Sequence, residues 1–154
     1  MPQGQIQLTN KIVLVSGCLL GFSCRYDGKS CRDKNLIKLI SDRIAVPFCP
    51  EQLGGLPTPR IPANIVKGNG RDVINGKAKV VNGDGVDVTI QFIRGAKETL
   101  KIVKSLKIKE AYMKTNSPSC GAENHPLKYF SNEGVTAALL RSKGIKIIPV
   151  QGGR

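Results

Sequence analysis

The chain has 154 residues, 40% of them hydrophobic, which suits one folded domain with a single core. It carries 24 lysines and arginines against 11 acidic residues, and its formal net charge of +13 suits either an anionic partner, such as a nucleotide or a nucleic acid, or solvated lysines that only keep the protein in solution. The absence of Trp and the shortage of other aromatic residues argue against a module that binds single-stranded nucleic acid by base stacking.

In chain order, the first predicted element is a buried strand over 11–17, an apolar run rich in β-branched residues. A polar loop follows, and then a helix over 35–43 that Asp33 or Asn35 is expected to cap. Residues 44–49 form a second short apolar run and predict a second strand.

The middle of the chain is dominated by turn-forming residues. Residues 50–65 are rich in Pro and Gly, which predicts a shaped loop with no regular element. Paired Asn-Gly and Asp-Gly steps within 76–90 indicate a β-hairpin excursion or a turn into the next helix. Apolar residues at helical spacing predict a helix over 88–106. The remaining predicted elements are a strand over 110–115, a helix over 133–144 and a strand over 145–150.

This alternation of strands and helices predicts the fold class. The strands are apolar almost throughout, as expected when both faces of a parallel sheet are covered by helices. We therefore predict one α/β domain over 1–154: a mostly parallel, Rossmann-like sheet with helices on both faces and a small β-hairpin excursion.

The apolar run near the N-terminus is too short for a signal sequence or a membrane span, so a cytoplasmic location is expected. Five cysteines in a reducing compartment favour metal binding or thiol chemistry over disulfides. Cys18, Cys49 and Cys120 each follow a different predicted strand. Because parallel strands end at one edge of a sheet, these three thiols are expected to converge on one site.

Three converging thiols have several uses, and spacing alone leaves them open. They can hold a metal centre with an open position for substrate, act as nucleophiles, or be buried as small apolar side chains. Cys24, six positions after Cys18, is a candidate fourth ligand, a resolving thiol or a packing residue. Cys31 stands beside basic residues and is expected only to pack in its loop.

Three blocks of sequence resemble a known family. The segments "SGCLLGFSCRYDG" (16–28), "FCPEQLGGLPTPR" (48–60) and "NSPSCG" (116–121) are similar to the TudS-like thiouracil desulfidase family and occur in that family's order. The segment "DVTIQFIRGAKETL" (87–100) also resembles the family's helix start. The visible departure is Gly17, where the family pattern has Ala.

The resemblance implies a cofactor and a reaction. It implies a [4Fe-4S] cluster held by Cys18, Cys49 and Cys120, with one iron left open. It also implies removal of sulfur from a thiolated uracil compound, which yields the oxo-base and hydrogen sulfide. The expected partner is thus a small thiolated pyrimidine or its nucleotide, with no membrane.

The chemistry also needs protein groups that move protons and hold the substrate. Glu51 follows Cys49 by two residues, so we predict that it is the general acid/base; the alternative is a structural ion pair with Arg60. Ser117 is predicted to position water or the base edge, and Ser119 to bind substrate, although local turn hydrogen bonds would explain both.

The loop after the first strand offers a phosphate site. Ser23, Arg25 and Tyr26 are expected to bind substrate there, because backbone amides and a guanidinium suit a phosphate such as that of 4-thiouridine monophosphate. The sole histidine, His125, is expected to have only a surface or packing role. The alternative function is a basic RNA- or tRNA-binding module with a structural metal site.

Overall fold

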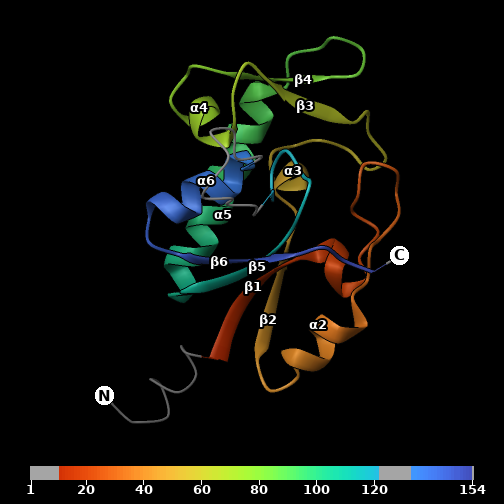
Figure 1. The fold of residues 1–154 in the computed structure, drawn as a ribbon, viewed down its shortest axis with the longest axis vertical. Coiled ribbons are helices and arrows are strands. Elements are labelled where there is room, and N and C mark those ends of the chain that lie inside the picture. The colour runs from red at the N-terminus through yellow and green to blue at the C-terminus, as the bar shows by residue number, and fades with distance from the viewer. Residues whose placement is uncertain (1–10, 122–132, 154) are drawn as a thin grey trace.

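The computed structural model describes residues 11–121 and 133–153 (Figure 1). At its centre lies a four-stranded sheet in the order β2-β1-β5-β6, and every neighbouring pair is parallel. The strands are β1 (Ile12–Ser16), β2 (Ile44–Phe48), β5 (Glu110–Lys114) and β6 (Lys146–Val150). The predicted α/β class and mostly parallel sheet are confirmed.

Helices cover both faces of this sheet, which explains why the strands are apolar almost throughout. On one face, Leu14 packs in a core with residues of α5 (Thr89–Leu106) and α6 (Val135–Ser142). On the other face, Val13 and Val15 pack with residues of α2 (Lys34–Leu39) and of the short 3-10 helix η1 (Gly17–Leu20). The side chain of Asp33 caps α2 by accepting a hydrogen bond from the Leu36 N–H at 2.9 Å. Of the two predicted capping residues, Asp33 is therefore the one that caps the helix.

A smaller layer stands beside the sheet, at the top of Figure 1. It contains the antiparallel pair β3 (Ala63–Val66) and β4 (Lys79–Asn82), and the helix α4 (Gly70–Ile74). The predicted β-hairpin excursion is confirmed as a small antiparallel sheet. In it, β4 pairs with the earlier strand β3 and not with a second strand inside 76–90. The turn after β4 makes one isolated bridge, between Val81 and Asp87, and leads into α5.

The prediction that 50–65 contains no regular element is wrong. The one-turn helix α3 (Pro50–Leu53) begins this segment, and β3 begins near its end. A proline at the first helical position and an acidic residue in the first turn favour α3, while the glycines that follow stop it after one turn. β3 depends on a partner strand more than ten residues away, so local sequence gives it little signal.

Two glycines allow α3 to contact α5 at very short range. A Cβ atom at Gly54 would lie 2.0 Å from the carbonyl oxygen of Gln91, and one at Gly95 would lie 1.9 Å from that of Pro50. Side chains cannot occupy these positions without moving one helix. This contact fixes α3, and therefore the residues at its start, against the long helix.

We expect Gly54→Ala to destabilise the protein by about 1–3 kcal/mol, the usual cost of overpacking. The backbone at Gly54 is right-handed helical, so steric contact with Gln91 is the cause. Urea unfolding followed by circular dichroism measures the loss. The exposed Ser105→Ala in α5 is the control and should leave the free energy of unfolding nearly unchanged. Equal stability of the two variants would contradict the close-packing argument.

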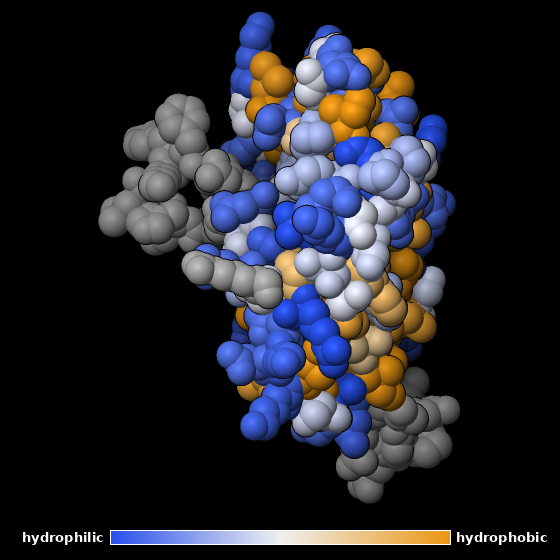
Figure 2. All heavy atoms as spheres, turned by 90° about the vertical axis from the view of Figure 1, so that its right-hand side faces the viewer, coloured by the Kyte–Doolittle hydropathy of each residue, from blue (hydrophilic) through white to orange (hydrophobic). Residues whose placement is uncertain are grey.

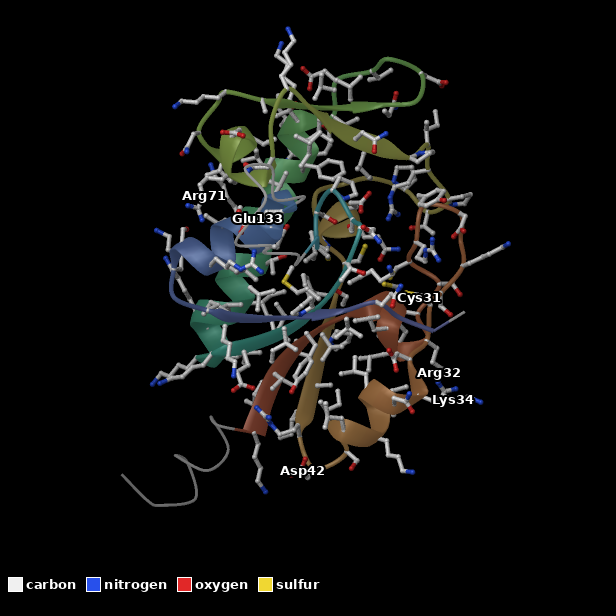
Figure 3. All side chains as sticks on the ribbon, viewed as in Figure 1. Cys31, Arg32, Lys34, Asp42, Arg71 and Glu133 are labelled. Atoms are coloured by element: carbon white, nitrogen blue, oxygen red, sulfur yellow. The ribbon has the colours of Figure 1, made fainter. Side chains whose placement is uncertain are left out.

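The start of α6 is fixed to α4 by a buried carboxylate. Glu133 forms ion pairs with Arg141 at 2.5 Å and with Arg71 at 3.9 Å; Figure 3 shows Arg71 and Glu133 side by side. Gly70 donates its N–H to the Glu133 carbonyl at 2.6 Å. These contacts anchor the N-terminus of α6, which in turn supports the candidate site. No helix in the described ranges has the length and apolar character needed to span a membrane.

Candidate metal and substrate site

A cavity of about 220 Å³ opens at the carboxyl ends of β1, β2 and β5, between the sheet and the β3–β4 layer. This is the edge where ligands bind in open α/β sheets. The cavity is lined by Cys18, Cys24, Cys49 and Cys120 together with Glu51, Arg60, Arg25, Tyr26, Lys114, Ser117 and Ser119. The structure therefore brings the three sequence-predicted thiols into one cavity.

Each thiol is placed by the element that follows its strand. Cys18 lies in η1, directly after β1, and Cys49 is the residue that caps the N-terminus of α3, directly after β2. Cys120 lies in the loop after β5, and its backbone N–H donates to the Ser117 hydroxyl at 3.1 Å.

Helix α6 also holds the Cys120 loop in place. The backbone N–H groups of Val135 and Thr136 donate to the carbonyls of Pro118 and Ser119 at 2.8 and 2.9 Å. A Cβ at Gly134 would lie 2.4 Å from the Ser119 carbonyl, so only glycine allows this close approach. The first turn of α6 is thereby used to fix the position of Cys120.

Cys24 belongs to the same group of thiols, which the sequence left open. The Cys49 thiol donates to the Cys24 carbonyl at 3.7 Å, and the interaction of Cys24 with its two neighbours raises the pKa values of Cys18 and Cys49 and lowers that of Cys24. Burial raises the pKa of Cys120 to about 12. All five cysteines are unpaired, and Cys31 contacts Cys18 behind the cavity without lining it.

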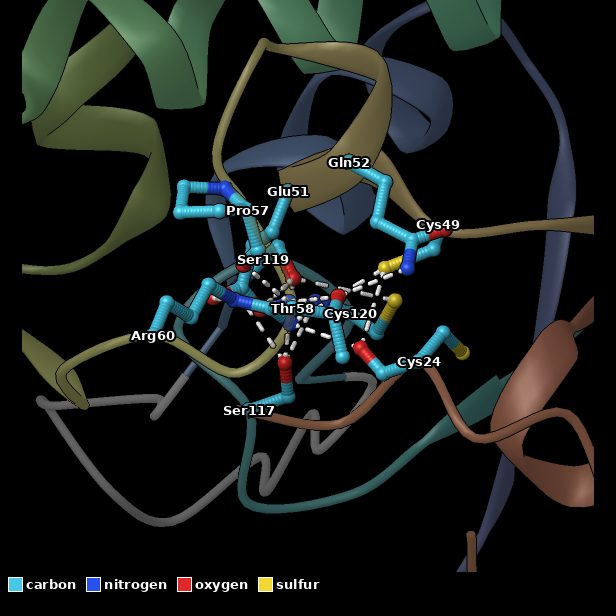
Figure 4. Close-up of polar contacts among 10 residues, drawn as sticks. All are labelled: Cys24, Cys49, Glu51, Gln52, Pro57, Thr58, Arg60, Ser117, Ser119 and Cys120. Carbon is cyan, nitrogen blue, oxygen red and sulfur yellow. Dashed lines mark hydrogen bonds and ion pairs between the residues drawn. The ribbon is translucent and has the colours of Figure 1, made fainter. Parts of the chain in front are cut away.

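Glu51 and Arg60 form a nearly buried ion pair at the cavity wall (Figure 4). The Arg60 Nε donates to Glu51 Oε1 at 3.1 Å, and their side chains are only 5% and 14% exposed. Arg60 also donates through Nη2 to the Cys24 carbonyl at 2.9 Å, and this nitrogen lies 4.0 Å from the Cys49 sulfur. The ion pair with Arg60, which the sequence offered as a purely structural role for Glu51, is therefore present. The same ion pair also holds the Glu51 carboxylate beside the thiols.

Ser119 connects this ion pair to the Cys120 loop. Its hydroxyl donates to Glu51 Oε2 at 3.0 Å, lies 3.1 Å from the Ser117 hydroxyl and 3.9 Å from the Cys120 sulfur. Ser117 also makes the turn hydrogen bonds that the sequence alternative expected, since it accepts from the backbone amides of Ser119 and Cys120. Glu51, Ser119 and Ser117 thus form one continuous hydrogen-bonded chain along the wall.

The predicted phosphate loop reaches the cavity only in part. Arg25 and Tyr26 line it, with the guanidinium carbon 5.7 Å from the centre of the Tyr26 ring. Ser23 is exposed and does not line the cavity. His125 lies outside the described residues.

Sequence reasoning missed how central Arg60 is, and it missed Lys114 altogether. Together with Arg25 they give the described part of the cavity wall three cations, against Glu51 as its one acidic side chain. The wall as a whole is positive and suits an anionic ligand. On the face shown in Figure 2, hydrophilic and intermediate atoms cover the centre, and apolar atoms gather at the upper end and on the lower right side.

The spacing of the cavity thiols bears on the kind of metal centre that they could hold. Within the described ranges, no three His, Cys, Asp or Glu side chains are grouped closely enough to hold one metal ion. Ligands of a cluster bind different irons and stand farther apart than ligands of one zinc ion. Three thiols from different loops around a cavity of about 220 Å³ are consistent with the cluster.

Comparisons with known proteins point the same way. Residues 13–151 match the 2-thiouracil desulfurase family. The chain is 43% identical over 142 residues to the Bacillus subtilis (strain 168) protein YbbK, described as uncharacterized, covering 89% of this chain and 94% of that protein. Its fold matches the solved structure of the [4Fe-4S]-dependent thiouracil desulfidase TudS with a TM-score of 0.73 and 39% identity, over 91% of each chain.

Proposed function

Because the chain belongs to the 2-thiouracil desulfurase family, we propose that it is a [4Fe-4S]-dependent desulfidase of thiolated uracil compounds. The observation that carries the proposal is the convergence of Cys18, Cys49 and Cys120 on one cavity that also contains Glu51. The net reaction is hydrolysis without redox change: water supplies the oxygen of the product carbonyl, and the substrate sulfur leaves as hydrogen sulfide. Five free thiols suit a reducing cytoplasm.

The three thiolates would hold the cluster. When bound, it would supply an iron with an open position, a Lewis acid for the soft thiocarbonyl sulfur. The protein supplies the rest. Arg60 donates to the Cys24 carbonyl and lies 4.0 Å from the Cys49 sulfur, so it would stabilise the position of Cys49 when the cluster is bound.

Glu51 is the base in this proposal. Its Oε1 is held by Arg60 and its Oε2 accepts from Ser119, so the carboxylate is fixed at the cavity wall. It would take a proton from the attacking water and return one to the leaving sulfur. Ser119 and Ser117 would orient that water or the edge of the pyrimidine, since their hydroxyls lie 3.1 Å apart beside Glu51.

We further propose that the substrate is a nucleotide. Arg25 lines the cavity and forms no ion pair with a described residue, so its guanidinium is available for an anionic group. Lys114 adds a second cation to the wall. We therefore favour a thiolated uridine monophosphate, such as the 4-thio compound, over the free base.

The test is an anaerobic assay of sulfide release from thiolated bases, nucleosides and monophosphates, with protein whose iron and sulfide content are measured. We expect broad absorption near roughly 400 nm, typical of such clusters, and sulfide release that requires the cluster. Loaded protein that releases no sulfide from any member of the panel would contradict the proposal. So would equal turnover by protein without iron.

For the nucleotide preference, Arg25→Ala should raise KM for the monophosphate by roughly tenfold, the value of one charge-assisted hydrogen bond, with little change for the free base. Lys29→Ala is the matched control: it removes a cation from the same loop that does not line the cavity. Steady-state kinetics on both substrates measure the difference. An equal rise in KM for base and monophosphate would show that Arg25 does not recognise phosphate.

A further inference from the structure

The short helix η1, which carries Cys18, depends on a neighbouring segment for its position. It has four residues and no side-chain cap, and a 3-10 helix of this length is marginal on its own. Residues 31–33 lie along it. The backbone N–H of Cys31 donates to the Cys18 carbonyl at 3.0 Å, and the N–H of Asp33 donates to the Leu19 carbonyl at 2.9 Å. The position of Cys18 is therefore tied to residues 31–33.

Residues 31–33 are held in turn by the segment that follows β6, residues 151–153. The Gly153 N–H donates to the Cys31 carbonyl at 3.0 Å, and Figure 3 shows Cys31 beside the carboxyl end of β6. The Cys31 backbone thus accepts from Gly153 and donates to Cys18. It joins three parts of the chain that lie far apart in sequence.

This contact requires two glycines. A Cβ atom at Gly153 would lie 2.1 Å from the Arg32 carbonyl oxygen. Gly152 has a φ of 89°, which favours glycine, and a Cβ atom there would lie 3.2 Å from both the sulfur and the carbonyl oxygen of Cys31. At either position a side chain would push the 151–153 segment away from residues 31–33.

We propose that Gly152 and Gly153 form a clasp that positions Cys18 for the cluster. The inference rests on the proposed function, in which Cys18 is a ligand. The link runs through the Cys31 backbone, so it does not require the Cys31 thiol. With the clasp displaced, η1 would sample more positions, and holding Cys18 in the one that binds iron would cost more conformational entropy. The cluster should then be held less tightly.

The experiment compares anaerobically loaded wild type, Gly153→Ala and Gln151→Ala. Gly153→Ala should release iron to an excess of chelator roughly 10- to 100-fold faster, the usual effect of losing support around a metal ligand. It should also alter the visible circular dichroism of the cluster, which depends on the arrangement of its thiolate ligands. Gln151→Ala is the matched control: Gln151 is exposed in the same segment, so this variant should behave as wild type.

Urea unfolding of the same proteins separates positioning from general stability. A merely structural role would lower the free energy of unfolding of Gly153→Ala and leave the circular dichroism of its cluster unchanged, and this result would overturn the clasp. Equal iron release by Gly153→Ala and wild type would also overturn it.

A second measurement needs no cluster. Cys31 is only 4% exposed, and the clasp covers it. In metal-free protein, Gly153→Ala should therefore speed alkylation of Cys31 by iodoacetamide, measured by peptide mass spectrometry, while Cys120 and the Gln151→Ala variant should react as in wild type. Unchanged alkylation of Cys31 would overturn the clasp. Wild type that binds no cluster would instead overturn the proposed function, and the alkylation rates would still show whether the clasp holds Cys31.

Discussion

Cys49→Ala is expected to lose both the bound iron and sulfide release. Cys49 lies at the junction of β2 and α3 and is one of the four cysteines that line the cavity. A cluster held by three thiolates has no spare ligand, so removal of one should reduce iron content and activity to background. Iron and acid-labile sulfide analysis, with the visible spectrum, measures the loss.

Cys31→Ala is the control for this variant. Cys31 is buried, as Cys18 and Cys120 are, but does not line the cavity, so the protein should keep its iron and its activity. Retention of a full cluster by Cys49→Ala would show that another thiol, with Cys24 the nearest, serves as ligand. Equal iron loss in both variants would point to general unfolding instead.

Glu51→Gln should keep the cluster and reduce kcat by roughly 100- to 10,000-fold, the usual contribution of a general acid/base. The substitution keeps the shape of the side chain and an oxygen that can accept from Ser119 or Arg60, but it removes the group that takes the proton. Anaerobic kinetics on protein of measured iron content separates this effect from loss of the cofactor.

The control for Glu51 is Glu98→Gln, which neutralises an exposed carboxylate paired with Lys101 on α5. It should leave kcat unchanged. If Glu51→Gln turned over substrate like wild type, Glu51 would be only the structural partner of Arg60. If it lost iron as Cys49→Ala is expected to, Glu51 would act by supporting the cluster.

The sheet and the meeting point of the thiols could be predicted because both depend on simple rules. Each strand of the parallel sheet is a short apolar run, and each of Cys18, Cys49 and Cys120 follows one of these runs. Parallel pairing then requires all three to lie at one edge. No knowledge of side-chain contacts was needed.

The helix α3 and the position of the Arg60 side chain could not be predicted in the same way. α3 is one turn long, too short to be stable alone, and its position depends on the contact of Gly54 and Gly95 with neighbouring backbone. Arg60 reaches Glu51 only because the intervening Pro- and Gly-rich loop folds back, and no periodicity encodes that path. The exposure of Ser23 could not be predicted for a similar reason. The path of the loop after β1 decides which of its side chains face the cavity, and the sequence does not show that path.

The order of strands in the sheet has a consequence for synthesis of the protein. β5 lies between β1 and β6, yet it is made more than sixty residues after β2 has completed the first half of the sheet. A nascent chain on the ribosome that has not yet released residue 120 contains Cys18, Cys24 and Cys49 but lacks the side of the cavity that Cys120 forms. Under the proposed function such a chain could not hold the cluster, so we expect a fragment that ends before residue 120 to bind no iron.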